Sequence, residues 1–440
     1  METNHKIQDY VTTLCDQIRW KKAKEKVSQE IYDHIEDTKN GYIMQGLSED
    51  DAIESAIIET GDPIDLGTQF DRLHRPKPQW RMFGLVFILT LIGFAIDMFL
   101  FGDSPTAINY TDRVLWVAAG TVVMFVFYFA DFTMLAKSPA TWTFFTPVLF
   151  VLVFSAMFGR PANNMYDDTA SLLLLIYPLV FVSMLFNLRD KGAFGFIPCF
   201  TSLLVVGSMV SMLSVAHALA IILVCLCMLP ASVYKGWFFK SKRGGYIVST
   251  SACFVGIAVF LVPVLGISFR SARLNAIFNP WDSALSEGFF TITIREMISS
   301  AVWLGQGTPS YSFAWLVDET VFVFFARELL LAHVIFRFGW LPFLVVIGVI
   351  VAFIGISVKK CFAQKSALGF MVSLVVIAVF SVQILFYVLT NLGLPFVTSL
   401  QLPFVSPSAF GTMVNMALAG LMLSVFRTGD VVSDSRTVTY

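Results

Sequence analysis

Polar and charged residues interrupt the apolar second half of the chain at three places, and the first of them, RSARLNAIFNP, carries Arg270 and Arg273. An arginine presents a planar fork of N–H donors that fits a pyrophosphate or a carboxylate. Two arginines at the mouth of a membrane span can therefore hold an anionic lipid head group. The alternative is structural, since basic side chains at a membrane interface also extend toward lipid phosphates.

A candidate general base stands in the sequence AREL, where Glu328 follows Arg327 just ahead of an apolar stretch. A carboxylate against an apolar wall favours its protonated state, which suits proton transfer near neutral pH. An exposed ion pair with Arg327 is the alternative interpretation. Asp318 and Glu319 compete for the same role in the same loop.

The third segment, NLGLPFVTSLQLPFVSPSAFGTMVN, runs from Asn391 to Asn415. Its two Leu-Pro pairs and clustered serines indicate non-helical backbone between two membrane spans. At membrane depth such backbone is tolerated only when it is buried in protein or lines a wet cavity. The segment is therefore either the wall of a groove or a plain loop outside the membrane.

Composition indicates the kind of scaffold that must position these residues. Hydrophobic residues make up 56% of the 440 and charged residues only 14%, against about a quarter in soluble proteins, which indicates an all-α polytopic membrane protein. No basic stripe interleaved with aromatics suggests nucleic-acid binding, and no phosphate-loop, serine-hydrolase or zinc-protease motif is present. The six cysteines show no C-x-x-C spacing, so we expect neither disulfides nor a metal site.

Ten apolar stretches approach the ~20 residues that cross a bilayer, and they begin near residues 82, 114, 141, 170, 194, 214, 246, 329, 366 and 409. The short loops on one side hold Lys137, Arg189, Lys191, Lys235, Lys240, Lys242, Arg243, Lys359, Lys360 and Lys365, whereas those on the other hold only Arg113 and Arg160. The positive-inside rule then makes both termini cytoplasmic. Residues 268–328 form a long outer loop, of a length typical of functional loops.

Residues 1–75 form a separate predicted unit, a small helical domain on the cytoplasmic side. Val27, Ile31 and Ile35 recur at helical spacing, Ser48 is a predicted N-cap, and residues 61–63 (Gly-Asp-Pro) separate two further helices. The unit resembles the small helical prefix domain found ahead of some bacterial permeases and membrane enzymes, in its E-I-x-D-H-I-E-D, G-L-S-x-x-x-A and G-D-P-x-x-L-G elements. That resemblance implies a cytoplasmic regulator as partner. Residues 76–81 are the linker, 82–430 the membrane domain and 431–440 a cytoplasmic tail.

The membrane domain resembles the shape, elongation, division and sporulation (SEDS) family, which includes RodA, FtsW and SpoVE. RSARLNAIFNP is similar to the family's R-x-x-R-L-x-A-F-x-N-P, and a family glycine loop, G-S-G-G-L-F-G-x-G, falls on residues 299–307. The family's N-I-G and L-P-F-x-S-Y-G-G-S elements, with an asparagine further on, are matched by Asn391, Gly393, Leu402, Pro403, Phe404, Ser406 and Asn415. Divergent members carry an aspartate eleven residues before the glycine of an FGWL-like run. Counting back eleven from Gly339 selects Glu328, and a gapped register selects Glu319.

This resemblance implies a peptidoglycan glycosyltransferase that polymerises lipid II at the outer face of the cytoplasmic membrane, in cell division, shape or sporulation. Glu328, or alternatively Glu319, would be the catalytic base. The resemblance gives the substrate-binding positions as Arg270, Arg273, Ser300, Asn391, Ser406 and Asn415. A class B penicillin-binding protein is the implied partner, and no cofactor is implied, although a divalent cation could take part.

The sequence also departs from the family pattern. Glutamate replaces the aspartate, residues 299–302 read Ser-Ser-Ala-Val in place of G-S-G-G, and residues 406–410 read Ser-Pro-Ser-Ala-Phe in place of S-Y-G-G-S. Glycine permits close backbone approach and positive φ, so these losses predict a reshaped groove. A flippase for a lipid-linked precursor, or a catalytically inactive scaffold, are the alternative functions.

Overall fold

The computed structural model describes residues 3–101, 110–137, 165–239, 241–265, 275, 276, 278–283, 288–308, 329–394, 400–406 and 408–429. The described residues contain helices and connecting segments and no strand, which confirms the predicted all-α class. They divide into two compact units. The first contains residues 3–78 together with residues 426–429, and the second runs from Gln79 to Val425. Five predicted features lie outside the described residues: the span near 141, both arginines of RSARLNAIFNP, Glu319, Glu328 and the tail 431–440.

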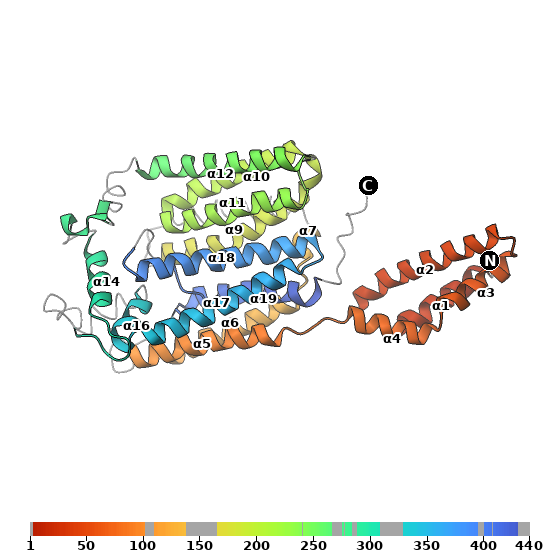
Figure 1. Ribbon diagram of the computed structural model, residues 1–440, viewed down its shortest axis with the longest axis horizontal. Helices are drawn as coiled ribbons and strands as arrows, with labels where there is room; N and C mark the ends of the chain where they lie inside the picture. The colour runs from red at the N-terminus through yellow and green to blue at the C-terminus, as the bar shows by residue number, and fades with distance from the viewer. Residues whose placement is uncertain are drawn as a thin grey trace. The chain divides into compact units, whose positions relative to one another are not determined.

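The first unit is a bundle of four helices, α1 (Thr3–Asp16), α2 (Lys21–Met44), α3 (Glu49–Thr60) and α4 (Pro63–His74) (Figure 1). The predicted cap is confirmed, because Ser48 Oγ accepts a hydrogen bond from Asp51 N at 3.4 Å. Asp62 caps α4 in the same way, with a proline at its first position. The core of the bundle contains Ile7, Leu14, Val27, Ile31, Ile35 and Ile53.

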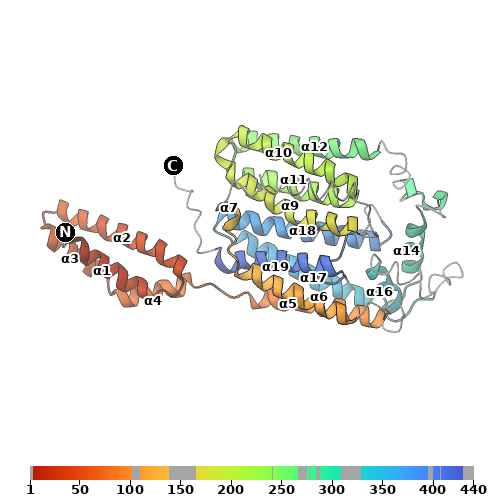
Figure 2. The same ribbon diagram turned by 180° about the vertical axis from the view of Figure 1, so that it is seen from behind.

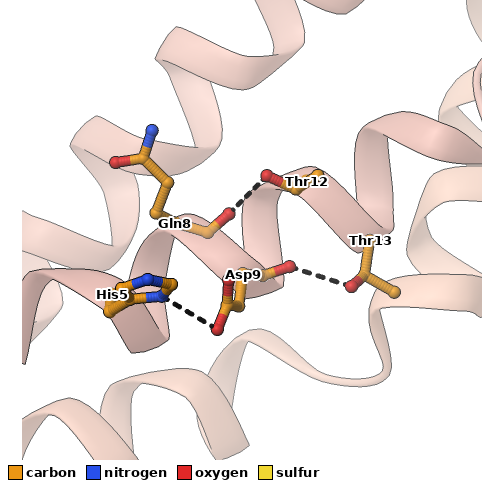
Figure 3. A network of polar contacts seen from close by, with 5 residues as sticks. All are labelled: His5, Gln8, Asp9, Thr12 and Thr13. Atoms are coloured by element: carbon orange, nitrogen blue, oxygen red, sulfur yellow. Dashed lines mark hydrogen bonds and ion pairs between the residues drawn. The ribbon is translucent and has the colours of Figure 1, made fainter.

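Helix α1 was not predicted from the sequence. Its exposed face is polar, and Figure 3 shows polar contacts there between residues one turn apart. His5 Nδ1 lies 3.2 Å from Asp9 Oδ2, Thr12 Oγ1 donates to Gln8 O at 2.7 Å, and Thr13 Oγ1 donates to Asp9 O at 2.8 Å. Polar contacts at this spacing contribute only a few tenths of a kcal/mol each, so the burial of its apolar face decides that α1 forms.

The second unit is built from long helices that run side by side in both ribbon views (Figures 1 and 2). Its first half contains α5 (Trp80–Phe101), α6 (Tyr110–Phe129), α7 (Met134–Lys137), α9 (Met165–Asn187), η1 (Arg189–Lys191), α10 (Ala193–Leu213), α11 (Val215–Tyr234) and α12 (Lys242–Leu265). Its second half contains η2 (Pro280–Ser283), α14 (Phe289–Ser299), α16 (Leu330–Phe338), α17 (Trp340–Phe362), α18 (Ala367–Asn391) and α19 (Ala409–Thr428). Helix α11 packs against α9, α10, α12 and α18 and is largely buried among them.

Seven of the described helices are long and apolar enough to cross a membrane: α5, α6, α10, α11, α12, α17 and α18. The protein is therefore a multi-pass membrane protein, as the composition predicted. Helices α9 and α19 also stand at predicted span positions. The two short helices α14 and α16 lie at one end of the long helices, where α14 runs across the bundle end (Figure 1).

The predicted start of a span near residue 329 is wrong. Helix α16 has nine residues, about 14 Å, against the ~30 Å of a bilayer core, and the span-length helix α17 starts only at Trp340. Gly339 separates them with φ +98°, a conformation that L side chains rarely adopt. The run FGWLPF, residues 338–343, is thus a junction between two helices. Pro342 lies in the first turn of α17, where proline is tolerated.

The described residues 400–406 between α18 and α19 are non-helical, as the Leu-Pro pairs predicted, and all but Gln401 are buried. Phe404 has φ +67° and its ring lies against Phe353 of α17 and Phe380 of α18, with centroid distances of 5.6 and 5.4 Å. Val405 is fully buried and contacts the backbone of Gly93 in α5 so closely that a side chain there would collide. This irregular backbone is therefore enclosed by protein, as membrane depth requires.

Candidate functional site

The glycine-loop residues and residues 336–341, which lie about thirty residues apart in sequence, are joined by four backbone hydrogen bonds. Gly305 N donates to Phe338 O at 3.0 Å and Gly307 N donates to Phe336 O at 2.8 Å. In the opposite direction, Trp340 N donates to Val302 O and Leu341 N to Trp303 O, both at 3.1 Å. The loop after α14 therefore docks along the α16–α17 junction.

Two glycines allow close backbone contacts here, one between Gly339 and the loop and one within the loop itself. A Cβ at Gly339 would lie 2.6 Å from Trp303 O, and a Cβ at Gly307 would lie 2.5 Å from Ser300 O. Both distances are shorter than any ordinary carbon–oxygen contact, so neither position accepts a side chain without moving backbone. The glycine of FGWLPF is thus required by the contact it makes, in addition to its φ angle.

Helix α18 supplies hydrogen-bond acceptors to the first turn of α16. Leu330 N donates to the hydroxyl of Tyr387 at 3.2 Å, and Ala332 N donates to Asn391 Oδ1 at 3.0 Å. The amide of Asn391 also donates to Tyr387 O at 2.9 Å, and the residue is fully buried. The first N–H groups of a helix have no partner within the helix, so these two side chains satisfy them from outside.

Helix α14 completes this group. Ile294 and Met297 pack against Leu329, Ala332 and Phe336 in one apolar cluster. We call α14, residues 300–307, α16 and the end of α18 the end cluster. It fixes the chain at Leu329, the residue that follows Glu328 in the sequence.

A second link joins α14 to the end of α18. Arg295 Nε donates to Gly393 O at 3.2 Å. Gly393 has φ +81°, and a Cβ there would lie 2.8 Å from Arg295 Cγ, so the arginine stem lies directly on the glycine. The first and last residues of the N-L-G element, Asn391 and Gly393, therefore both make contacts within the end cluster.

The predicted substrate-binding residues fall into two groups. Ser300 and Asn391 belong to the end cluster, where Ser300 Oγ donates to Met297 O at 3.0 Å at the end of α14. Ser406 and Asn415 belong to the buried segment and α19, where Ser406 Oγ accepts from Leu402 N at 2.9 Å. Their contact with a substrate stays a prediction, as do the roles of Arg270, Arg273, Glu319 and Glu328.

Sequence reasoning missed a buried ion pair between Asp97 of α5 and Arg113 of α6. The sequence placed Arg113 among the charges of a short loop, but α6 begins at Tyr110 and the arginine is only 7% exposed. Its Nη2 also donates to Val405 O at 3.2 Å, which ties the pair to the buried segment. The sequence feature that could have revealed this ion pair is Asp97, because an acidic residue inside an apolar membrane span needs a partner.

Comparison with known proteins agrees with this architecture. No protein-family model and no curated protein matches the sequence. The fold matches a chain of a solved peptidoglycan synthase complex, which coordinates polymerization and crosslinking, with TM-score 0.55 and 16% identity over 80% of this chain and 98% of that one. The rod shape determining protein RodA of Thermus thermophilus also matches, with TM-score 0.49 and 14% identity over 80% of this chain and 97% of that one. The SEDS-like architecture expected from the sequence is confirmed at the level of the fold.

Proposed function

We propose that the chain is a divergent lipid II polymerase of the bacterial cytoplasmic membrane, with both termini cytoplasmic and its site at the outer face. The observation that carries this proposal is the docking of residues 300–307 on the α16–α17 junction. Two sequence elements that resemble SEDS motifs meet there in space. The fold shared with a chain of a peptidoglycan synthase complex supports a role in peptidoglycan synthesis.

The proposed reaction is the attack of a sugar 4-hydroxyl on the anomeric carbon of the growing glycan. A carbon–oxygen bond forms there, and the bond to the pyrophosphate oxygen breaks and releases undecaprenyl pyrophosphate. Glu328 would accept the hydroxyl proton, and Arg270 and Arg273 would balance the charge on the leaving pyrophosphate. The end cluster supports this assignment of the base, because it holds the chain one residue beyond Glu328.

The test is polymerisation of lipid II by the purified protein, alone and with a class B penicillin-binding protein, which we propose as its partner. We expect Glu328→Gln to lower the rate roughly 100-fold or more, since a general base typically contributes that much. Glu319→Gln is the matched variant, because it removes the same charge at the competing position. If Glu328→Gln makes glycan normally and Glu319→Gln loses glycan synthesis, Glu319 is the general base.

One observation favours an inactive scaffold as the second candidate. Where the family loop begins with glycines, this chain continues α14 as a helix to Ser299, followed by Ser300, Ala301 and Val302. A site in which this backbone cannot approach a substrate would bind without turnover. A wild-type protein that makes no polymer with any partner, and moves no labelled lipid II across vesicles, would support the scaffold over both the polymerase and a flippase.

A further inference from the structure

The N-terminal unit is strongly divided in charge along its sequence. Residues 27–66 contain eleven acidic residues and one lysine. Residues 19–26 and 67–78 together contain eight lysines and arginines and two acidic residues. A charge asymmetry of this size within one small bundle indicates that its two parts face different surroundings.

The fold brings the two basic stretches together. Arg19 N donates to Asp71 Oδ1 at 2.9 Å, and α1 packs along α4, so the start of α2 lies beside the end of α4. Four exposed basic residues and one exposed apolar residue define the basic patch: Arg19, Lys21, Arg72, Arg75 and Leu73, the last of these 70% exposed.

The acidic side chains close to the basic patch are fewer than its four basic ones. Asp71 accepts from the Arg19 backbone, and Asp16 lies 3.6 Å from Lys24. Glu25 is exposed and is the remaining acidic side chain of these two stretches. The patch therefore carries a net positive charge, and its leucine adds an apolar group of the kind that enters the head-group region.

We propose that the basic patch docks on the anionic phospholipid head groups of the membrane that the second unit spans. Several lysines and arginines immediately before a membrane helix are the sequence pattern that binds anionic lipid surfaces. The connection favours this occupant, because only residues 75–79 separate α4 from α5, at most ~18 Å when extended. The acidic residues of 27–66 would face away from the negative surface. The proposal makes no assumption about catalysis.

The experiment measures how fast Lys21 is acetylated in the full-length protein, in nanodiscs of phosphatidylcholine alone or with phosphatidylglycerol. We expect acetylation of Lys21 to slow several-fold when the anionic lipid is present, and to recover in high salt, which screens exposed charges. Lys6, an exposed lysine of α1 outside the patch, is the internal reference and should not change.

Arg75→Glu should abolish the protection of Lys21, because each basic residue near an anionic surface changes the docking equilibrium roughly five-fold and a reversal changes two charges. Arg75→Lys, which keeps the charge, should retain it. Lys6→Glu is the matched reversal on the same unit and should leave the protection of Lys21 intact.

Equal acetylation of Lys21 in both kinds of nanodisc would overturn the proposal, as would full protection in Arg75→Glu. Polyglutamate added to phosphatidylcholine nanodiscs tests an acidic protein as the alternative occupant. If it protects Lys21 as strongly as phosphatidylglycerol does, the patch recognises acidic protein surfaces and the lipid proposal is wrong.

Discussion

Replacement of Asn391 by alanine should loosen the start of α16 without unfolding the membrane domain. The side chain accepts from Ala332 N at 3.0 Å and donates to Tyr387 O at 2.9 Å, and no part of it is exposed. Its removal leaves a buried N–H without an acceptor, which costs about 1–3 kcal/mol. A central value of about 2 kcal/mol corresponds to roughly 30-fold in the equilibrium for local opening.

Amide hydrogen exchange of the full-length protein, followed by mass spectrometry, measures this opening in peptides that cover residues 330–338. We expect exchange to rise roughly 30-fold there in Asn391→Ala, and to stay unchanged in peptides from α11. Asn415→Ala is the matched control, because it makes the same change in a buried asparagine of α19. Unchanged exchange at residues 330–338 in Asn391→Ala would refute the reasoning, since α16 would then not depend on α18.

Two further predictions concern the stability of the purified protein, measured as thermal unfolding in detergent. Gly339→Ala should destabilise it by about 2–3 kcal/mol, since alanine disfavours φ +98° and its Cβ would collide with Trp303 O. Gly348→Ala in α17 is the control: no atom lies within 4 Å of a Cβ added there, so this variant should be neutral or slightly stabilising. Asp97→Asn or Arg113→Gln alone should cost about 3–5 kcal/mol by leaving one buried charge, and the double variant should recover most of that loss. A double variant no more stable than the single ones would contradict the ion pair.

Residue patterns predicted the features that depend on neighbours in sequence. Ser48 caps its helix because the group it accepts from lies three residues away. The backbone of residues 400–406 is non-helical, as predicted, because Pro403 removes a hydrogen-bond donor. Apolar stretches of bilayer length likewise marked the helices that are described.

Features that depend on distant partners could not be predicted in this way. From Leu329 into α17 only His333 and Arg337 interrupt the apolar residues, so hydropathy hid the break between α16 and α17. At this break Gly339 lies against the backbone of Trp303, thirty-six residues earlier. Arg113 was counted as a loop charge, because sequence shows that an arginine is polar but not that an aspartate on the preceding helix neutralises it. Asn391 was linked to substrate through a motif, and its bond to Ala332, fifty-nine residues away, is visible only in the fold.

The enclosed position of α16 has a consequence for how this part of the gene can vary. Residues 330–336 are all buried, whereas α17 exposes Leu341, Leu344, Val345 and Val351 by half or more of their surface. The two adjacent helices therefore face opposite constraints, since protein surrounds residues 330–336 of α16 and lipid lies against one face of α17. Exchange of one aliphatic residue for another should cost little along that face of α17, while positions 330–336 should accept few alternatives.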